Sequence, residues 1–83
     1  MSDSYTREEI EKRVADALVS FGVDREAIAP ETTLEQLDVD SLDVVELAEL
    51  LRDLGIDIEG RDFEGTRTYG DAIDVVMARA KVS

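Results

Sequence analysis

The residues with the clearest chemical potential lie together in one short segment, Asp38-Val39-Asp40-Ser41-Leu42-Asp43. A serine hydroxyl can serve as a nucleophile, but it then needs a neighbouring base to take its proton. The chain has no histidine, and its only lysines, Lys12 and Lys81, lie far from this segment in the sequence. The usual catalytic triad therefore cannot be assembled, and the sequence argues against an autonomous hydrolase or transferase. The simplest alternative is that Ser41 or Asp40 only caps a helix that begins here.

The acidic residues of the same segment raise the question of a calcium site. An EF-hand loop starting at Asp38 would place Asp40 at its third position and Glu49 at its twelfth, as the motif requires. Its fifth position would be Leu42, which has no side-chain oxygen, and its sixth would be Asp43, where the loop needs glycine. We therefore expect no dedicated metal site. Weak binding of divalent ions, as in an acidic ion buffer, stays open as an alternative.

The charge of the chain narrows the classes of partner. Its 83 residues include 21 acidic and 9 basic side chains, which gives a formal net charge of −12. Nucleic acids and anionic membranes are bound through Lys and Arg, so neither is an expected partner. The negative field would instead attract and orient basic protein surfaces.

Length and composition predict a single domain over residues 1–83. The chain contains no cysteine, which excludes disulfides and thiolate metal sites. Its first residues are polar, and no apolar run approaches the length of a membrane-spanning helix, so we expect a cytoplasmic protein.

Apolar spacing predicts three main helices, at residues 6–21, 41–54 and 69–81. A capping box formed by Thr6 and Glu9 fits the start of the first helix. Helices of this number and length must pack their apolar stripes against one another to be stable.

Residues 22–40 form a long first loop, and loops of this length are often functional. A short turn is expected near Thr33–Leu37. A solvated linker would not need apolar residues, so we expect the loop to pack on the core through Ile28, Leu34, Leu37 and Val39.

The segment after the second helix is also irregular. Ile56 and Ile58 alternate with Asp57 as in a strand, but one strand would have no partner, so we predict an extended connection. Gly60 and Gly65 leave room for about one helical turn between them. Together these elements predict an all-α fold, a small four-helix bundle of three main helices plus one short helix, with a long first loop.

A helical wheel of residues 41–54 separates acids from leucines. One narrow face carries the acids, which are Asp43, Glu46, Glu49 and Asp53. An adjoining face carries the leucines, which are Leu47, Leu50, Leu51 and Leu54. Leu42 lies inside the acidic stripe and Val45 just beyond it, which is typical of a docking surface rather than a purely solvated face. Ten acidic and two basic residues fall within residues 38–64, so the charge is concentrated around Ser41.

Asp40-Ser41-Leu42, at the head of a leucine-rich helix and after a long loop, resembles the attachment motif of the acyl carrier protein family. Pro30-Glu31-Thr32-Thr33-Leu34 is similar to the first-loop segment of that family. The resemblance implies that Ser41 receives 4′-phosphopantetheine from coenzyme A, with Asp40 and Leu42 completing the motif. The thiol of this arm would carry acyl groups as thioesters, so the protein would be a carrier and not an enzyme. A helix start suits a phosphodiester, and a separate transferase would supply the base that this chain lacks.

The resemblance also implies the partners. They are a phosphopantetheinyl transferase and acyltransferase, ketosynthase or acyl-activating enzymes with basic docking patches. Contacts with them should be weak and reversible, because a shuttle must leave each partner, and we expect the carrier itself to be a monomer. The docking face would comprise Leu42, Asp43, Val45, Glu46, Glu49 and Asp53. The core, which in many relatives shelters part of the cargo, would comprise Leu47, Leu51, Ile58, Phe63, Ile73 and Val76.

Several departures from fatty-acid carriers bear on the pathway. Glu49 replaces an apolar residue of the partner face, and Arg52 places a positive charge where an acid is usual. The segment Ile56–Gly60 is slightly shorter than in those carriers and lacks their proline. These departures favour a specialised pathway such as polyketide synthesis.

The residues before the serine bear on the type of cargo. Asp38-Val39-Asp40 stands where peptidyl carriers usually have Gly-Gly-His, which favours acyl over peptidyl cargo. Two alternatives stay open: a carrier for fatty-acid synthesis, and an interaction module of the same fold that is never modified.

Overall fold

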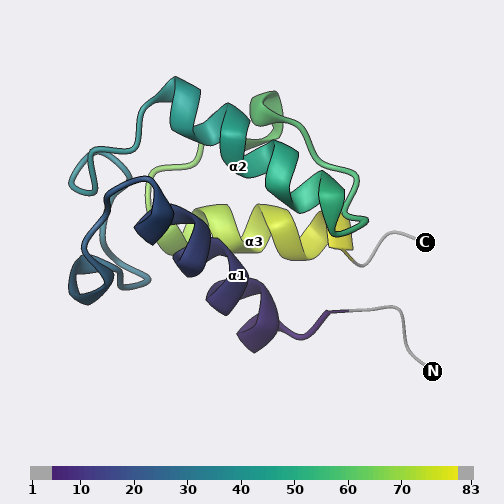
Figure 1. Cartoon of the computed structure of the whole chain (residues 1–83), viewed down its shortest axis with the longest axis horizontal. Coiled ribbons are helices and arrows are strands. Elements are labelled where there is room, and N and C mark those ends of the chain that lie inside the picture. The colour runs from purple at the N-terminus through teal and green to yellow at the C-terminus, as the bar shows by residue number, and fades with distance from the viewer. Residues whose placement is uncertain (1–4, 81–83) are drawn as a thin grey trace.

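The computed structural model describes residues 5–80, and this part of the chain is helical apart from its connections. The isolated bridge between Thr33 and Thr68 is the only β-type pairing that these residues form. The predicted all-α fold is therefore confirmed. The elements in chain order (Figure 1) are α1 (Arg7–Ser20), η1 (Arg25–Ala27), α2 (Ser41–Asp53), η2 (Gly60–Phe63) and α3 (Tyr69–Ala80), where η marks a short 3₁₀ helix.

The predicted helix starts are confirmed, and hydrogen bonds from nearby side chains cap them. The Glu9 N–H donates to Thr6 Oγ1 and the Thr6 N–H donates to the Glu9 carboxylate, both at 3.1 Å, which is the predicted capping box. Thr68 and Asp71 form the same reciprocal pair at the start of α3, at 3.0 and 3.3 Å. The predicted end of the last helix at Lys81 lies outside the described residues.

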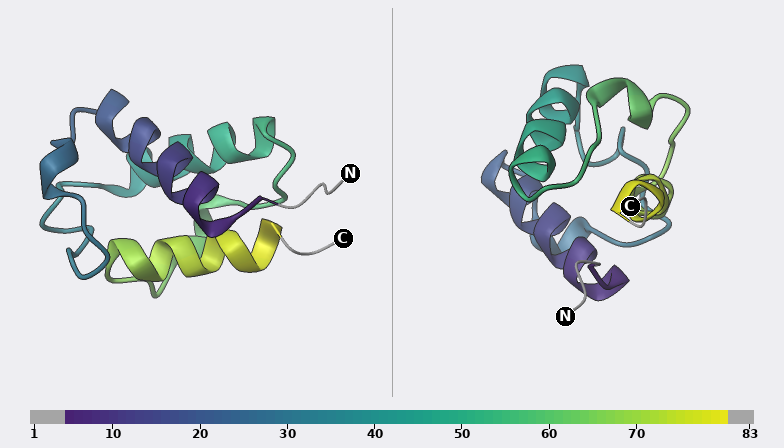
Figure 2. Two further views of the ribbon diagram at one scale, coloured as in Figure 1. Left: turned by 90° about the horizontal axis from the view of Figure 1, so that it is seen from below. Right: turned by 90° about the vertical axis from the view of Figure 1, so that its right-hand side faces the viewer.

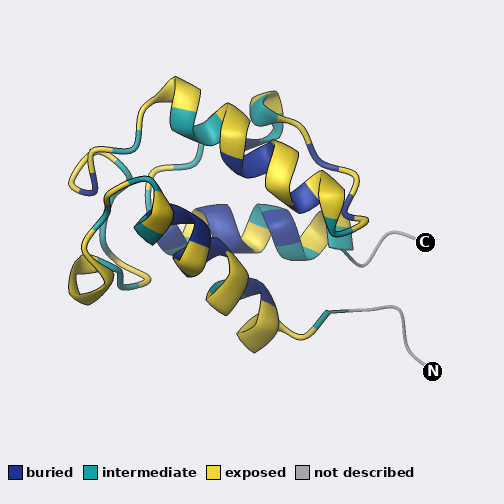
Figure 3. Ribbon diagram, in the orientation of Figure 1, coloured by how far each residue is buried: buried dark blue, intermediate teal, exposed yellow. Residues whose placement is uncertain are grey.

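The core is built from the inward faces of the three α-helices. α1 contacts both α2 and α3, and the long loop closes one end of the bundle (Figure 1, Figure 2). Buried residues lie on the sides of the helices that face one another, as Figure 3 shows. The six residues expected in the core are all at most 5% exposed: Leu47, Leu51, Ile58, Phe63, Ile73 and Val76.

The long loop between α1 and α2 is held to the start of α3 by backbone hydrogen bonds. The Leu34 N–H donates to the Arg67 carbonyl at 2.8 Å, and the Tyr69 N–H donates to the Thr32 carbonyl at 2.8 Å. Its apolar residues pack on the core as predicted, with Leu37 buried and its other apolar members partly buried, namely Ile28, Leu34 and Val39. The turn predicted near Thr33–Leu37 is present, with the Leu37 N–H donating to the Thr33 and Leu34 carbonyls. η1, which Asp24 caps through the Glu26 N–H, was not predicted.

The segment between α2 and α3 contains no regular strand, as predicted, and is anchored at two points. Arg52 Nη1 donates to the Ile58 carbonyl at 2.9 Å, which ties the extended connection back to α2. Arg79 on α3 donates to the Asp62 carboxylate of η2 at 2.7 Å. The hydrogen bond from the Glu59 N–H, aided by Arg79, lowers the pKa of Asp62. Arg52 therefore has a structural partner that its position in the sequence does not reveal.

The direction of the helices places the Asp40–Ser41 junction at one end of the molecule. α2 begins at the top of the left half of Figure 1, next to the long loop, whereas α1 begins at the lower edge and α3 ends at the right, both away from that junction. No helix within residues 5–80 is both long enough and apolar enough to cross a bilayer.

Candidate functional site

The start of α2 is capped by Asp40 and not by Ser41. Asp40 Oδ1 accepts from the Asp43 N–H at 2.9 Å, and Asp43 Oδ2 accepts from the Asp40 N–H at 3.3 Å. Ser41 is the first residue of the helix, is exposed, and its hydroxyl forms no hydrogen bond with any other described residue. The choice that the sequence left open, Ser41 or Asp40 as the cap, is thus decided for Asp40. The serine hydroxyl is left available for chemistry.

The residues just before the helix form a tight turn with an unusual backbone. Asp38 has a φ of 60°, in the left-handed region that only glycine adopts freely, and Asp is among the few other residues found there. Its N–H donates to the Glu35 carbonyl at 3.1 Å, and the Val39 N–H donates to the Leu34 carbonyl at 3.0 Å. This turn fixes the direction in which the chain enters α2.

The first turn of α2 offers unpaired donors beside the serine. The backbone N–H groups of Ser41 and Leu42 have no acceptor among residues 5–80, because the first N–H groups of a helix have no partner within it. The carboxylate of Asp40 satisfies only the N–H of Asp43. Free N–H groups and the positive end of the helix dipole favour an anion at this position. The residues present therefore fit a phosphodiester attached to the Ser41 oxygen.

A pocket of about 400 Å³ opens between α2 and η2 directly beside Ser41. The close approach of η2 to α2 here depends on Gly60, because a Cβ at this position would lie only 3.2 Å from Val45 Cγ2. Its lining combines apolar and polar residues: Leu34, Val39, Asp40, Ser41, Val44, Val45, Gly60, Arg61, Phe63, Glu64 and Thr66. The pocket offers a slender chain attached at Ser41 an apolar surface to lie against.

The residues expected to form the docking face lie along α2, and most of them are free. Leu42 and Val45 are 70% and 47% exposed, although both are large apolar side chains. Glu46, Glu49 and Asp53 are exposed, and none of them takes part in an ion pair within the described part of the chain. Asp43 differs, because it is only partly exposed and its carboxylate belongs to the capping box.

The carboxylates of the described residues do not converge on a common point. No group of three or more acidic side chains between residues 5 and 80 is placed so that it could hold one metal ion.

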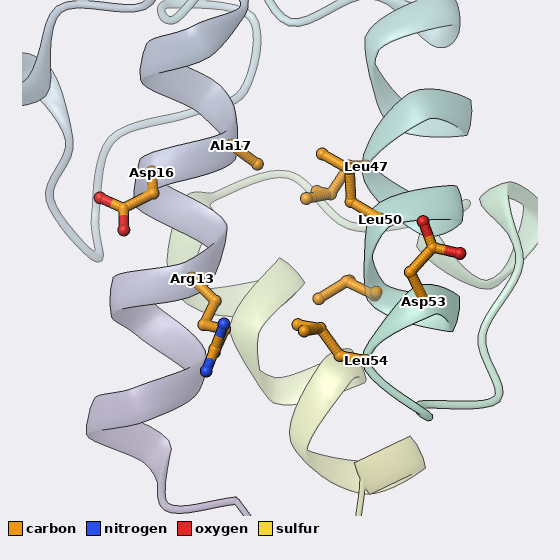
Figure 4. A pocket seen from close by; sticks show the side chains of 8 residues that line it. Arg13, Asp16, Ala17, Leu47, Leu50, Asp53 and Leu54 are labelled. Atoms are coloured by element: carbon orange, nitrogen blue, oxygen red, sulfur yellow. The ribbon is translucent and has the colours of Figure 1, made fainter.

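A second groove, of about 370 Å³, lies between α1 and α2, and sequence reasoning missed it. Leu47, Leu50 and Leu54 project from α2 toward α1 (Figure 4). Leu50 belongs to the leucine face of the helical wheel, yet it is 43% exposed. Helical spacing predicts the direction of a side chain but not whether the neighbouring helix is close enough to cover it.

Comparison with known proteins places the chain among relatives of known description. A family model described as "Phosphopantetheine attachment site" matches residues 12–76. "Acyl carrier protein 2" of Ralstonia nicotianae is 39% identical over 61 residues, which are 71% of this chain and 75% of that protein. "Acyl carrier protein" of Lactobacillus johnsonii is 36% identical over 76 residues, which are 88% of this chain and 95% of that protein.

A third relative comes from a mycobacterium. "Meromycolate extension acyl carrier protein" of Mycobacterium leprae is 35% identical over 77 residues, which are 89% of this chain and 67% of that protein. No solved structure gives a significant match. Because the family model spans most of the chain and the Lactobacillus relative aligns over nearly its whole length, the chain belongs to the acyl carrier protein family, whose members are non-catalytic carriers with a covalent 4′-phosphopantetheine group.

Proposed function

We propose that Ser41 is the residue to which 4′-phosphopantetheine is attached, and that the chain carries acyl intermediates as thioesters on that arm. The observation that carries this proposal is the division of roles at the start of α2. Asp40 caps the helix, so the exposed Ser41 hydroxyl has no structural duty among the described residues. A hydroxyl that held the helix together would lose that role on modification.

The arm supplies the thiol on which acyl groups are held, and the chain supplies the setting for it. The N–H groups of Ser41 and Leu42 can donate to phosphate oxygens without breaking any bond of the fold. The capping box of Asp40 and Asp43 fixes the first turn, so the attachment oxygen keeps its position when the group is added. The pocket between α2 and η2 supports the further idea that part of the arm or cargo is sheltered there.

The exposed face of α2 supports docking to enzymes with basic patches. Its free carboxylates, Glu46, Glu49 and Asp53, together with the net charge of −12, would steer a basic surface toward Ser41. Leu42 and Val45 provide the apolar contacts that such an encounter needs to become specific. We propose the phosphopantetheinyl transferase as the first partner, followed by acyltransferase, ketosynthase or acyl-activating enzymes.

For the pathway, we propose specialised acyl synthesis such as polyketide formation, with fatty-acid synthesis as the alternative. Glu49 is exposed on the proposed docking face. By resemblance, fatty-acid carriers have an apolar residue at this position. Arg52 no longer adds to this argument, because its guanidinium is bound to the Ile58 carbonyl. The relatives' names include a meromycolate extension carrier, which keeps the fatty-acid alternative open.

The proposal is tested by incubating the protein with coenzyme A and a phosphopantetheinyl transferase and measuring its intact mass. We expect the mass to rise by one phosphopantetheine for the wild type and for Ser20→Ala, and not for Ser41→Ala. Ser20 is a suitable control because its hydroxyl is already bound to the Ala17 carbonyl. Modification of Ser41→Ala would exclude Ser41 as the site. A wild type that no transferase modifies, but that binds a partner, would indicate the unmodified interaction module.

A further inference from the structure

The exposed side of α2 is an acidic ridge with an apolar groove along each flank. The pocket beside Ser41 lies on the flank that faces η2 and includes Val45. The groove between α1 and α2 lies on the other flank and includes Leu50. Glu46, Glu49 and Asp53 stand between them, all exposed.

Leu50 is an exposed apolar residue directly after Glu49. Glu49 occupies the position at which fatty-acid carriers, by resemblance, present an apolar residue to their partners. The next residue, Leu50, is 43% exposed and is one of three large hydrophobic side chains on the described surface, with Leu42 and Val45. Leu50 therefore lies one helix position, about 100°, from Glu49, on the side of α2 that lines the groove with α1.

Inside the groove the surface is apolar and carries one charge. Leu47, Leu50 and Leu54 line it from α2 and Ala17 from α1, while Arg13 projects toward it from α1 (Figure 4). Two acids of the rim, Asp16 and Asp53, point away from the groove in the same view. Asp16 is also engaged elsewhere, in an ion pair with Arg25 at 2.6 Å.

Arg13 decides what kind of side chain the groove accepts. It forms no ion pair with any residue between 5 and 80, so no described carboxylate holds its guanidinium. A basic side chain of a partner would be repelled from the groove and attracted to the ridge. The acidic ridge and the groove together favour a partner surface that is basic opposite Glu46 and Glu49 and apolar opposite Leu50.

Two other occupants fit less well. A second copy of the chain would bring another net charge of −12 against this acidic face, which disfavours association. Cargo attached at Ser41 would have to pass nine residues along α2, about 13 Å, to reach Leu50, although an apolar pocket opens directly beside Ser41.

We propose that the phosphopantetheinyl transferase that modifies Ser41 seats an apolar side chain in the groove between α1 and α2, against Leu50 and Leu54. An enzyme that reaches the Ser41 hydroxyl must cover the start of α2, and the groove continues that surface toward α1. This inference rests on the proposed function and extends the docking face from α2 to α1.

The test compares binding of the transferase to Leu50→Gln and Glu46→Gln, each in a Ser41→Ala background so that no turnover intervenes. Calorimetry at low salt should show Kd raised about five- to tenfold for Leu50→Gln, as for an apolar anchor of moderate weight. In about 1 M salt the increase in Kd caused by Glu46→Gln should disappear, because charges are screened. The increase in Kd caused by Leu50→Gln should persist. Ala78→Gln, which introduces the same side chain at an exposed position on α3, serves as the matched control.

Other outcomes overturn the inference. Unchanged affinity of Leu50→Gln beside weakened Glu46→Gln would show that the transferase leaves the groove uncovered. Unchanged affinity, together with faster hydrolysis of a thioester on a Leu50→Gln protein that keeps Ser41 and has been loaded, would assign the groove to cargo. A dimer that Leu50→Gln dissociates would assign it to a second copy. Failure of the proposed function looks different, since the wild type with Ser41 intact would then gain no mass with any transferase.

Discussion

At the residue scale, the cap of α2 and the exposed hydroxyl beside it belong to two neighbouring residues, Asp40 and Ser41. A carboxylate caps the helix, and the adjacent hydroxyl is left exposed. The sequence predicts that a helix begins at this point, because Asp and Ser are both favoured caps. It does not predict which of them acts as the cap, since this depends on the dihedral angles of Asp40 and Ser41. The structure assigns Asp40 a β-type backbone, with ψ of −176°, and the capping role.

Asp38 carries a prediction about backbone strain. Its φ of 60° is tolerated by Asp but strongly disfavours a β-branched residue. We expect Asp38→Val to lower the free energy of unfolding by about 1–2 kcal/mol. Asp38→Gly should change it by less than about 0.5 kcal/mol, because relief of strain is offset by greater freedom of the unfolded chain. Urea unfolding of both variants at pH 7 measures the difference, and equal stabilities would contradict the strain.

Tyr69 carries a prediction about alkaline pH. The residue is 5% exposed, its hydroxyl donates to the Glu11 carbonyl at 2.8 Å, and burial raises its pKa from 10.0 to about 12. Folding therefore favours the protonated phenol, so its stabilisation is complete below pH 10 and is lost as the pH rises toward 12. The loss at pH 12 amounts to about 3 kcal/mol at most.

The measurement is urea unfolding of the wild type and Tyr69→Phe across this pH range. At pH 8 the variant should be less stable by about 1 kcal/mol, because the Glu11 carbonyl loses its partner. The gap should narrow and then reverse as the pH approaches 12, since phenylalanine cannot ionise. A gap that stays constant would show that Tyr69 does not titrate in this range.

At the element scale, the helices could be predicted closely and the contacts between distant segments could not. The first two helices were each placed within one residue, because their caps at Thr6 and Asp40 are local chemistry. η1 was missed, because one turn capped by Asp24 has no apolar period. The bridge between Thr33 and Thr68 joins residues far apart in the chain, which no local pattern specifies.

Gly70 carries a prediction at the junction of the long loop with α3. Its N–H donates to the Pro30 carbonyl at 2.9 Å, and a Cβ at this position would lie 3.0 Å from that same oxygen. Alanine within a helix is normally more stable than glycine by about 1 kcal/mol. Here we expect Gly70→Ala to be less stable than the wild type by about 1 kcal/mol, because the loop must move away.

Thermal unfolding and amide hydrogen exchange test this expectation together. The amides of Tyr69 and of residue 70 should exchange faster in the variant, since their acceptors are loop carbonyls. Ala78→Gly, at an exposed position on the same helix, calibrates the ordinary propensity effect. A Gly70→Ala protein that melts above the wild type would show that the loop gives way without cost.

At the scale of the whole molecule, a small body of 36 × 23 × 21 Å carries a large unbalanced charge. The sequence predicts this charge and its concentration around α2, because both are counts of residues. It does not predict the groove between α1 and α2, because the groove depends on how far apart the helices pack. The proposed docking surface is thus partly a property of composition and partly of packing.

The charge predicts opposite effects of salt on stability and on docking. Screening weakens repulsion within the folded chain, so the melting temperature should rise by about 5 °C between low and high salt. The same screening should raise the KM of the transferase for this protein, because attraction to its basic patch is reduced. A double variant, Glu46→Gln with Glu49→Gln, should show a weaker salt dependence of KM. A KM that does not change with salt would argue against electrostatic steering.

The direction in which the helices run has a practical consequence. α1 begins and α3 ends at the end of the molecule that is remote from Ser41 (Figure 1). A protein immobilised on a bead or sensor through an added peptide at either of those helices would therefore present its serine outward, toward the solution. Captured in that way, the carrier could be passed from one enzyme to the next on a solid support, and each step could be followed without detaching it.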